Sequence, residues 1–212
     1  MAQLDATGQL EDTLVFLSSD NGPEMETWPD AAYSPFRSAK GSTWEGGQRV
    51  PGIASWSGMI SPDRASDGIF SQMDLFNTFL SLAAAGDAVP GDRYIDGVDQ
   101  TSFLLDPEGV SNRKYLYYWL TNVFSGLRVG EWKFMVASSS DDDRDCYNLG
   151  GFTGVTQRYS HGRLYNLYLD PKENHSYMVR KLAYIESFTS GIANHLMTFG
   201  PYPPKHPIAA MS

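Results

Sequence analysis

A carboxylate and an amide stand side by side just after an apolar run in residues 13–17, where Asp20 and Asn21 follow two serines. Both side chains offer hard oxygen donors of the kind that Ca²⁺ or Mg²⁺ prefers. Asparagine beside aspartate, in place of histidine, favours a single hard cation over a zinc-type site. Gly22 and Pro23 then turn the backbone sharply. A polar turn that merely ends a strand explains the same residues, so this stretch alone leaves both interpretations open.

The elements around this turn indicate an α/β fold. Residues 13–17 favour β-structure and have no polar interruption, which predicts a buried strand of a parallel sheet. The polar turn would then lie at the carboxyl end of that strand, where open α/β sheets usually place their sites. Ser71 and Asp74 have capping-box spacing, and an apolar stripe at helical spacing continues to residue 83. We expect this helix to pack against the sheet.

The pattern of apolar residues changes near residue 112. Short apolar segments at residues 115–119, 126–129, 132–136 and 163–169 predict antiparallel strands, with a hairpin turn at residues 130–131. A long helical pattern follows over residues 177–199 and ends at prolines. We therefore predict a sheet-and-helix part at residues 1–111 and a small antiparallel β-sheet subdomain, packed by a C-terminal helix, at residues 112–212.

A glycine-rich block with one lysine, KGSTWEGG at residues 40–47, follows SSDNGP at residues 18–23. The two blocks together resemble the sulfatase family of the alkaline phosphatase superfamily. Three further blocks are similar to family segments in the same order: MDLF at 73–76, DGVD at 96–99 and LYNLYLDP at 164–171. The last has Asn166 where aspartate is usual. The resemblance covers nearly the whole chain and implies the C-terminal part of an alkaline-phosphatase-like catalytic domain for residues 1–111, followed by the family's C-terminal subdomain.

The resemblance assigns roles to three residues. Asp20 and Asn21 match two metal ligands, and Lys40 matches the lysine that contacts the sulfate group. The Lys40 ammonium would stabilise the charge that grows on oxygen as the S–O bond breaks, whereas a solvated surface lysine is the alternative. Ca²⁺ takes about six to eight oxygens. Two ligands are therefore not expected to hold Ca²⁺, or Mg²⁺ in its place, strongly in this chain alone.

The residues around Lys40 have structural interpretations beside the functional one. Glu45 and Arg49 are expected to pair or to brace the loop, and the glycines of the block would let it approach the site closely. Trp44 and Trp28 either line a pocket for an aromatic or sugar leaving group or pack in the core. The histidines lie outside the matched blocks and are interpreted as structural or surface residues: His161, His175, His195 and His206.

The family's nucleophile is a formylglycine made from a Cys/Ser-x-Pro-x-Arg motif, which these 212 residues do not contain. Cys146 lacks the proline and arginine, and the spacing match at residues 33–37 begins with Tyr33. The resemblance implies that the formylglycine, the catalytic histidine and the other metal ligands belong to a missing N-terminal part. We expect a sulfuric ester hydrolase of the arylsulfatase type to which this chain contributes metal- and sulfate-binding residues. The chain alone is expected to be inactive.

A second hypothesis treats the chain as a catalytically inactive, truncated or partner-dependent sulfatase-like module. A chain that begins at residue 1 would leave a sheet edge and a sheet face uncovered, which invites association. The partner would be either a second copy, giving a homo-oligomer, or a separate N-terminal half.

Charge and hydropathy argue against some classes of binding partner. The formal net charge of −9 argues against a nucleic-acid or anionic-membrane surface. No apolar run approaches the roughly 18 to 20 residues that span a bilayer. The start lacks the basic and apolar segments of a signal peptide, but a leader in the missing N-terminal part would escape notice, so localisation is not indicated. The acidic run at residues 141–143 is interpreted as a solvated loop rather than a weak cation site.

Overall fold

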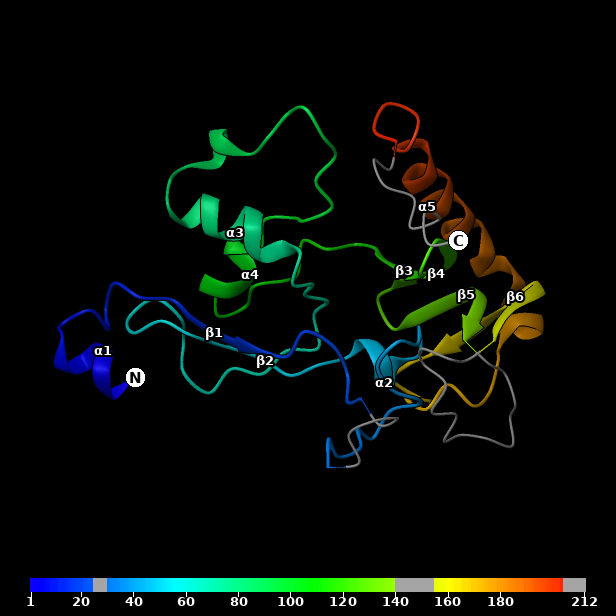
Figure 1. Cartoon of the computed structure of the whole chain (residues 1–212), viewed down its shortest axis with the longest axis horizontal. Coiled ribbons are helices and arrows are strands. Elements are labelled where there is room, and N and C mark those ends of the chain that lie inside the picture. The colour runs from blue at the N-terminus through cyan, green and yellow to red at the C-terminus, as the bar shows by residue number, and fades with distance from the viewer. Residues whose placement is uncertain (25–29, 140–154, 204–212) are drawn as a thin grey trace. The chain divides into compact units, whose positions relative to one another are not determined.

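Two compact units make up the part of the chain that the computed structural model describes, residues 1–24, 30–139 and 155–203. Unit 1 comprises residues 1–20 and 50–114, and unit 2 comprises residues 21–49 and 115–212 (Figure 1). Residues 21–49 thus group with the C-terminal unit, and the functional division at residues 111 and 112 stays a prediction. Four predictions fall outside the described residues: Trp28, the acidic run at 141–143, Cys146 and His206.

Unit 1 contains a two-stranded antiparallel ribbon, in which β1 (Val15–Ser18) pairs with β2 (Gly52–Ser55). The predicted strand therefore exists, but its expected burial in a parallel sheet is wrong for this chain. Leu17 is 63% exposed, and its cross-strand partner Ile53 is 57% exposed. An apolar run predicts extended structure, but it specifies neither the direction of the neighbouring strand nor the cover on each face. The ribbon is joined in unit 1 by α1 (Ala2–Ala6), η1 (Gly86–Ala88) and α4 (Thr101–Leu105).

The predicted helix after residue 71 is α3 (Asp74–Leu82), and polar groups hold its buried side. The Asp74 carboxylate accepts the backbone N–H of Ser71 at 2.9 Å, which confirms one half of the capping box. The Ser71 hydroxyl accepts instead from the backbone N–H of Met73, at 3.4 Å. The expected apolar core face is wrong, because Phe76 and Phe79 are exposed while Asp74 and Thr78 are buried.

Unit 2 is built on a four-stranded antiparallel sheet in the order β3-β4-β5-β6. Its strands are β3 (Leu116–Leu120), β4 (Val123–Val129), β5 (Trp132–Ser139) and β6 (Thr156–Asn166). Gly130 adopts φ 55° between β4 and β5, so the predicted hairpin turn is confirmed. A short helix, α2 (Glu45–Gln48), belongs to the same unit. The predicted antiparallel subdomain is therefore confirmed.

The C-terminal helix α5 (Ile185–Met197) packs on one face of this sheet (Figure 1). Its Phe188 joins a core cluster with Leu127, Phe134 and Leu164. Gly191 lets the helix approach closely, because a Cβ there would lie 3.0 Å from the ring of Tyr115. The predicted helical stretch is interrupted near its start by η2 (Met178–Tyr184), where the backbone kinks. The packing helix itself is confirmed.

The opposite sheet face carries a second cluster, made by Trp44, Met135, Tyr165 and Leu167. Side chains alternate between the faces along a strand, so Lys133 lies on the same face as Met135. Glycine-rich residues 38–47 therefore pack, through Trp44, against the face of the sheet that α5 leaves open. Across the residues that the structure describes, no helix is long and apolar enough to span a membrane.

Candidate functional site

The turn that carries Asn21 and the loop that carries Lys40 are joined by backbone hydrogen bonds. The Gly22 N–H donates to the carbonyl of Gly47 at 3.1 Å, and the Lys40 N–H donates to the carbonyl of Pro23 at 3.0 Å. We call residues 38–47 the lysine loop. Two segments that are separated by a poorly patterned stretch of sequence are thus brought side by side within unit 2.

Glycine is required where these segments meet. A Cβ on Gly22 would lie 1.8 Å from the carbonyl oxygen of Gly46, a distance that no side chain can occupy. A Cβ on Gly46 would lie 2.2 Å from the carbonyl oxygen of Ser38. Gly41 adopts φ 85°, in the region that favours glycine. The glycines of the block therefore serve close backbone approach, as the sequence suggests.

The structure places the proposed metal ligands on a turn with accessible side chains. Asp20 is exposed and Asn21 is half-buried, and the Asn21 amide donates to the carbonyl of Gly22 at 2.9 Å. Their carboxylate and amide oxygens fit a hard cation, but they supply two of the several oxygens that Ca²⁺ takes. No group of three or more His, Cys, Asp or Glu side chains able to hold a metal occurs among residues 1–24, 30–139 and 155–203. The donors in hand thus suit the chemistry but do not complete a cation site.

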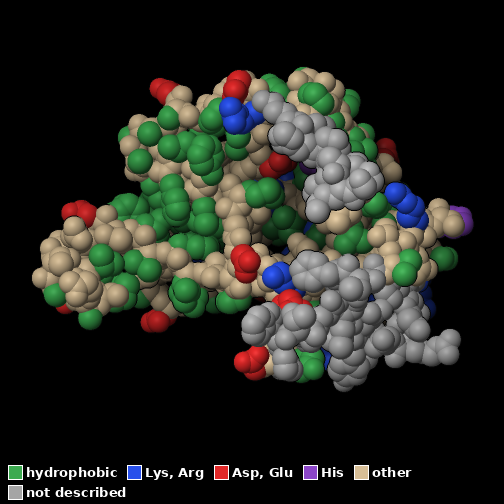
Figure 2. Space-filling model, viewed as in Figure 1, with side chains coloured by type: hydrophobic (Ala, Val, Ile, Leu, Met, Phe, Trp, Pro, Cys, Tyr) green, Lys and Arg blue, Asp and Glu red, His purple; other side chains and the backbone are tan. Residues whose placement is uncertain are grey.

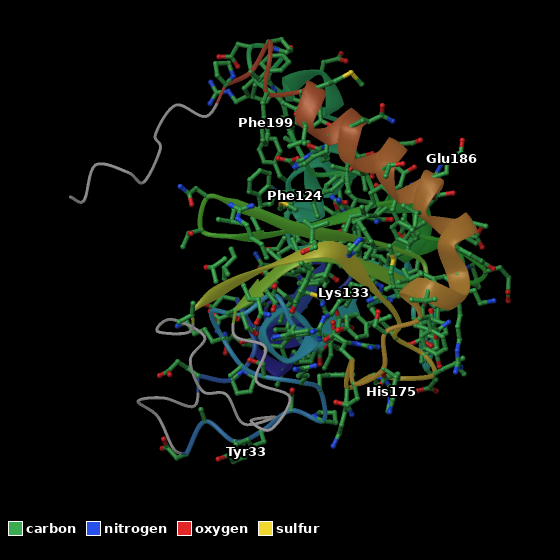
Figure 3. The ribbon with its side chains drawn as sticks, turned by 90° about the vertical axis from the view of Figure 1, so that its right-hand side faces the viewer. Tyr33, Phe124, Lys133, His175, Glu186 and Phe199 are labelled. Carbon is green, nitrogen blue, oxygen red and sulfur yellow. The ribbon has the colours of Figure 1, made fainter. Side chains whose placement is uncertain are left out.

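The lysine loop is anchored by charges buried beneath it. Glu45, 2% exposed, forms ion pairs through its carboxylate with Lys133 at 3.1 Å and with Arg128 at 3.6 Å. Lys133, fully buried within the sheet (Figure 3), also pairs with Glu173 at 2.8 Å. We call Glu45, Arg128, Lys133 and Glu173 the buried charge cluster. Two carboxylates and two cations give it a formal charge of zero.

Hydrogen bonds extend this cluster into the loop backbone. Lys133 Nζ donates to the carbonyl of Thr43 at 2.7 Å, and the Glu45 N–H donates to Oε2 of Glu173 at 2.8 Å. Arg37, just before the loop, donates to the Glu173 carbonyl at 2.8 Å. The loop is therefore held by its main chain as well as by the Glu45 side chain.

The electrostatics of the two carboxylates differ. Burial alone would raise the pKa of Glu45, but the charges of Lys133 and Arg128 bring it below its usual value. Burial raises the pKa of Glu173, and the nearby Glu45 adds to that rise against the pull of Lys133. Burial beside Glu45 also raises the pKa of Tyr118 well above its usual value. Tyr118 thus stays a neutral O–H donor, at 3.0 Å from Glu45 Oε1.

Sequence analysis identifies only part of this arrangement. The expected bracing role of Glu45 has a structural basis, but its partners are the distant Lys133 and Arg128, while the guanidinium of Arg49 lies over the ring of Phe36. Lys133 and Glu173 lie outside the motif blocks of the sequence. The one available signal is a lysine inside the apolar strand of residues 132–136, at a position that alternation directs to a covered face.

The aromatic and histidine side chains take structural positions. Trp44 is buried, and its indole N–H donates to the Ser139 carbonyl at 3.3 Å, so core packing is the alternative that the structure supports. His161 and His175 are exposed. His195 is buried in the sheet–helix interface, where its ring stacks on Tyr117 at 3.9 Å between centroids. Among the described residues, the histidines are thus surface or structural.

The fold defines the class of the protein through its likeness to solved structures. PsFucS1 sulfatase from Pseudoalteromonas sp. matches with a TM-score of 0.89 at 36% identity, over 97% of this chain and 41% of that chain. Ps i-CgsB matches with a TM-score of 0.70 at 21% identity, over 96% of this chain and 40% of that chain, and shows likeness of fold alone. The structure is accordingly the C-terminal part of an alkaline-phosphatase-like α/β domain together with its antiparallel subdomain.

Sequence comparison identifies the family. A model described as "Sulfatase" matches residues 1–85, and one described as "Putative sulfatase AslA C-terminal domain" matches residues 125–199. The N-acetylgalactosamine-6-sulfatase of Canis lupus familiaris is 40% identical over 125 residues, 58% of this chain and 23% of the relative. The arylsulfatase of Hemicentrotus pulcherrimus is 34% identical over 154 residues, 71% of this chain and 27% of the relative. The chain belongs to the sulfatase family, and it spans about a quarter of the length of these two curated relatives.

Proposed function

We propose that this chain forms part of a sulfuric ester hydrolase of the arylsulfatase type and supplies its sulfate-contacting lysine and two of its metal ligands. Family membership supports the reaction class. The observation that carries the site is the pair of backbone hydrogen bonds from Gly22 to Gly47 and from Lys40 to Pro23. These bonds bring the Asn21 turn against the loop that bears Lys40, as a shared site for a cation and an anion requires.

Each residue has a definite chemical task in this proposal. The Lys40 ammonium contacts a sulfate oxygen and stabilises the negative charge that grows as the S–O bond breaks. Asp20 and Asn21 contribute a carboxylate and an amide oxygen to a hard cation, Ca²⁺ or Mg²⁺, which when bound neutralises sulfate charge. We expect the formylglycine nucleophile, the catalytic histidine and the remaining ligands to come from sequence outside these 212 residues. The isolated chain should then hydrolyse no sulfate ester.

A second candidate, a non-catalytic module that depends on a partner, is favoured by exposed apolar side chains on unit 1. Hydrophobic side chains are visible around the ribbon of unit 1 in Figure 2. Besides the exposed Leu17–Ile53 pair, Phe76 is 45% and Phe79 44% exposed. Exposed apolar side chains gathered in this way are typical of interaction surfaces. The partner would be either a second copy or a separate N-terminal half.

Binding can be tested without turnover. Inorganic sulfate is titrated into the chain with Ca²⁺ present, and backbone amide shifts are followed by NMR. The proposal predicts shifts at residues 20–22 and 40–47, and their loss in Lys40→Met. Lys172→Met, which removes an exposed lysine, is the matched control and should behave like the wild type. Shifts that avoid Lys40, or that persist in Lys40→Met, would contradict the proposed contact.

Molecular mass in solution and sulfatase activity distinguish the partner-dependent module from the first candidate. Light scattering of the chain should show a dimer or larger species, or one that forms when a separate N-terminal half is added. Turnover of a chromogenic aryl sulfate should be absent for the chain and present for an assembly that carries the nucleophile. Turnover by the pure chain would show that the nucleophile lies within it. A stable, monodisperse monomer indifferent to any N-terminal half would argue against the partner-dependent module.

A further inference from the structure

The buried charge cluster is more elaborate than packing of the lysine loop requires. Lys133 is fully buried, and its ammonium donates hydrogen bonds to the Thr43 carbonyl and to Glu45 and forms an ion pair with Glu173. A buried ion pair contributes little net stability compared with apolar side chains of similar volume. Charged side chains instead add geometric specificity, because charge-assisted hydrogen bonds form only when donor and acceptor are correctly oriented. The cluster therefore indicates a requirement for the exact placement of the loop.

We propose that Lys133 and Glu173 are positioning residues, which hold the lysine loop so that Lys40 can meet the sulfate group. This inference rests on the function proposed above for Lys40. Lys133 lies near the start of β5, an inner strand of the antiparallel sheet, and Glu173 follows the end of β6. The C-terminal subdomain would thus act on the sulfate contact through residues that do not themselves touch the substrate.

The contacts fall on the loop backbone close to Lys40. Lys133 holds the carbonyl of Thr43, three residues after Lys40. Glu173 holds the N–H of Glu45, five residues after Lys40. Main-chain contacts on both sides of Trp44 fix the path of the backbone, which a side-chain contact alone would leave free to rotate.

The same network reaches the turn that carries Asn21. From Glu45 the chain passes through α2 to Gly47, whose carbonyl accepts the Gly22 N–H. Arg37 completes a closed frame, because its carbonyl accepts the Gly46 N–H at 2.8 Å while its guanidinium donates to the Glu173 carbonyl. Within unit 2, Lys133 and Glu173 are thereby connected both to the lysine loop and to the turn that carries Asn21.

The test uses the full 212-residue chain and three variants. Lys133→Met removes the ammonium at nearly constant volume, Glu173→Gln removes one charge and keeps the side-chain length, and Lys172→Met is the exposed-lysine control. Amide hydrogen exchange is measured at Gly22, Glu45 and Gly46, with amides of β4 and β5 as the internal reference. Sulfate affinity in the presence of Ca²⁺ is measured on the same samples.

The proposal predicts roughly tenfold faster exchange at the loop amides relative to the sheet amides in both cluster variants, because hydrogen bonds to charged groups are lost. It also predicts weaker sulfate binding in these variants, with Lys172→Met unchanged. If Lys133→Met fails to fold, Glu173→Gln supplies the measurement. Unchanged exchange ratios, or undiminished sulfate affinity in a folded cluster variant, would overturn the proposal.

A different result is expected if the proposed function of Lys40, rather than its positioning by Lys133 and Glu173, is wrong. In that case the wild-type chain shows no sulfate-dependent change at Lys40, whatever the exchange rates of the variants. Positioning fails by itself when the wild type binds sulfate at Lys40 and the cluster variants bind it equally well.

Discussion

Asp74 in unit 1 and Glu45 in unit 2 are both buried carboxylates, 0% and 2% exposed, and each faces a buried cation. Asp74 pairs with Arg113 and accepts the backbone N–H groups of Ser71 and Val98, both at 2.9 Å. These contacts tie the start of α3 to the segment that follows it in the same unit. Asp74 therefore anchors a helix within its own neighbourhood.

Glu45 makes a different kind of anchor. Tyr118, Lys133 and Glu173, which contact it, are 73, 88 and 128 residues away along the chain. Its contacts join the lysine loop, which has a proposed chemical role, to the antiparallel sheet of unit 2, which has no proposed chemical role. A buried carboxylate can thus either stabilise the start of a nearby helix, as Asp74 does, or connect a loop to a sheet that is distant in sequence, as Glu45 does. The two cases should respond differently to loss of the cation.

The largest effect is expected from Lys133→Met, which leaves two buried carboxylates with Arg128 as their remaining cation in the cluster. Removal of one partner from a buried ion pair costs about 3–5 kcal/mol of unfolding free energy. Urea denaturation measures the change, with Lys172→Met as the control. A loss below about 1 kcal/mol would show that the cluster is not under the electrostatic constraint described here. The double variant with Glu173→Gln should lose less than the sum of the two single variants.

Arg113→Met should cost less, about 2–3 kcal/mol, because backbone N–H groups continue to satisfy the Asp74 carboxylate. Urea denaturation again provides the measurement. Amide exchange at Val98 should rise while exchange at Glu45 stays unchanged, since the two anchors belong to separate units. A cost equal to that of Lys133→Met would remove the distinction between the two carboxylates.

Gly22→Ala tests the backbone junction that the lysine loop makes with the Asn21 turn. The new Cβ would collide with the carbonyl of Gly46, and overpacking of this kind costs about 1–3 kcal/mol. Gly86→Ala is the matched control, because nothing lies within 4 Å of a Cβ there. Thermal unfolding of both variants should show a loss for Gly22→Ala alone. Equal stability of the two would contradict the close approach at the junction.

The smallest effect concerns pH. The pKa of Glu173 is raised by burial, so its contribution to stability is complete below the usual glutamate value of 4.5 and is lost as pH rises through the raised pKa. The pKa of Glu45 is lowered, so its contribution is present above 4.5 and is lost as pH falls through the lowered pKa. Glu173→Gln should therefore flatten the fall in unfolding free energy above pH 4.5. Glu45→Gln should flatten the rise in unfolding free energy with increasing pH below pH 4.5. If both variants altered the pH dependence in the same direction, the opposite pKa shifts of the two glutamates would be contradicted.

Local features of the fold could be predicted because their partners lie nearby in the sequence. The hairpin turn at Gly130 and the reach-back from Asp74 to Ser71 depend on residues within a few positions. The apolar stripe of α3 gave a wrong prediction of its buried face, because the polar network around Asp74 determines which side of the helix is buried.

The site could be predicted only in its motif-bearing part. Asp20, Asn21 and Lys40 stand in blocks that resemble a family, and their roles as ligands and sulfate contact stay predictions. Lys133 and Glu173 carry no local signal of partnership, because their ion pairs exist only after β5, β6 and the lysine loop have come together. Long-range pairing of charges follows from the fold and not from spacing.

A double-mutant cycle on sulfate affinity tests most directly whether the subdomain holds Lys40 in place. Sulfate binding in the presence of Ca²⁺ is measured for the wild type, Lys40→Met, Glu173→Gln and the double variant. If Glu173 positions Lys40, Glu173→Gln weakens sulfate binding when Lys40 is present and changes nothing once Lys40 has been removed. An equal loss from Glu173→Gln in both backgrounds would show that Glu173 acts independently of Lys40 and does not position it.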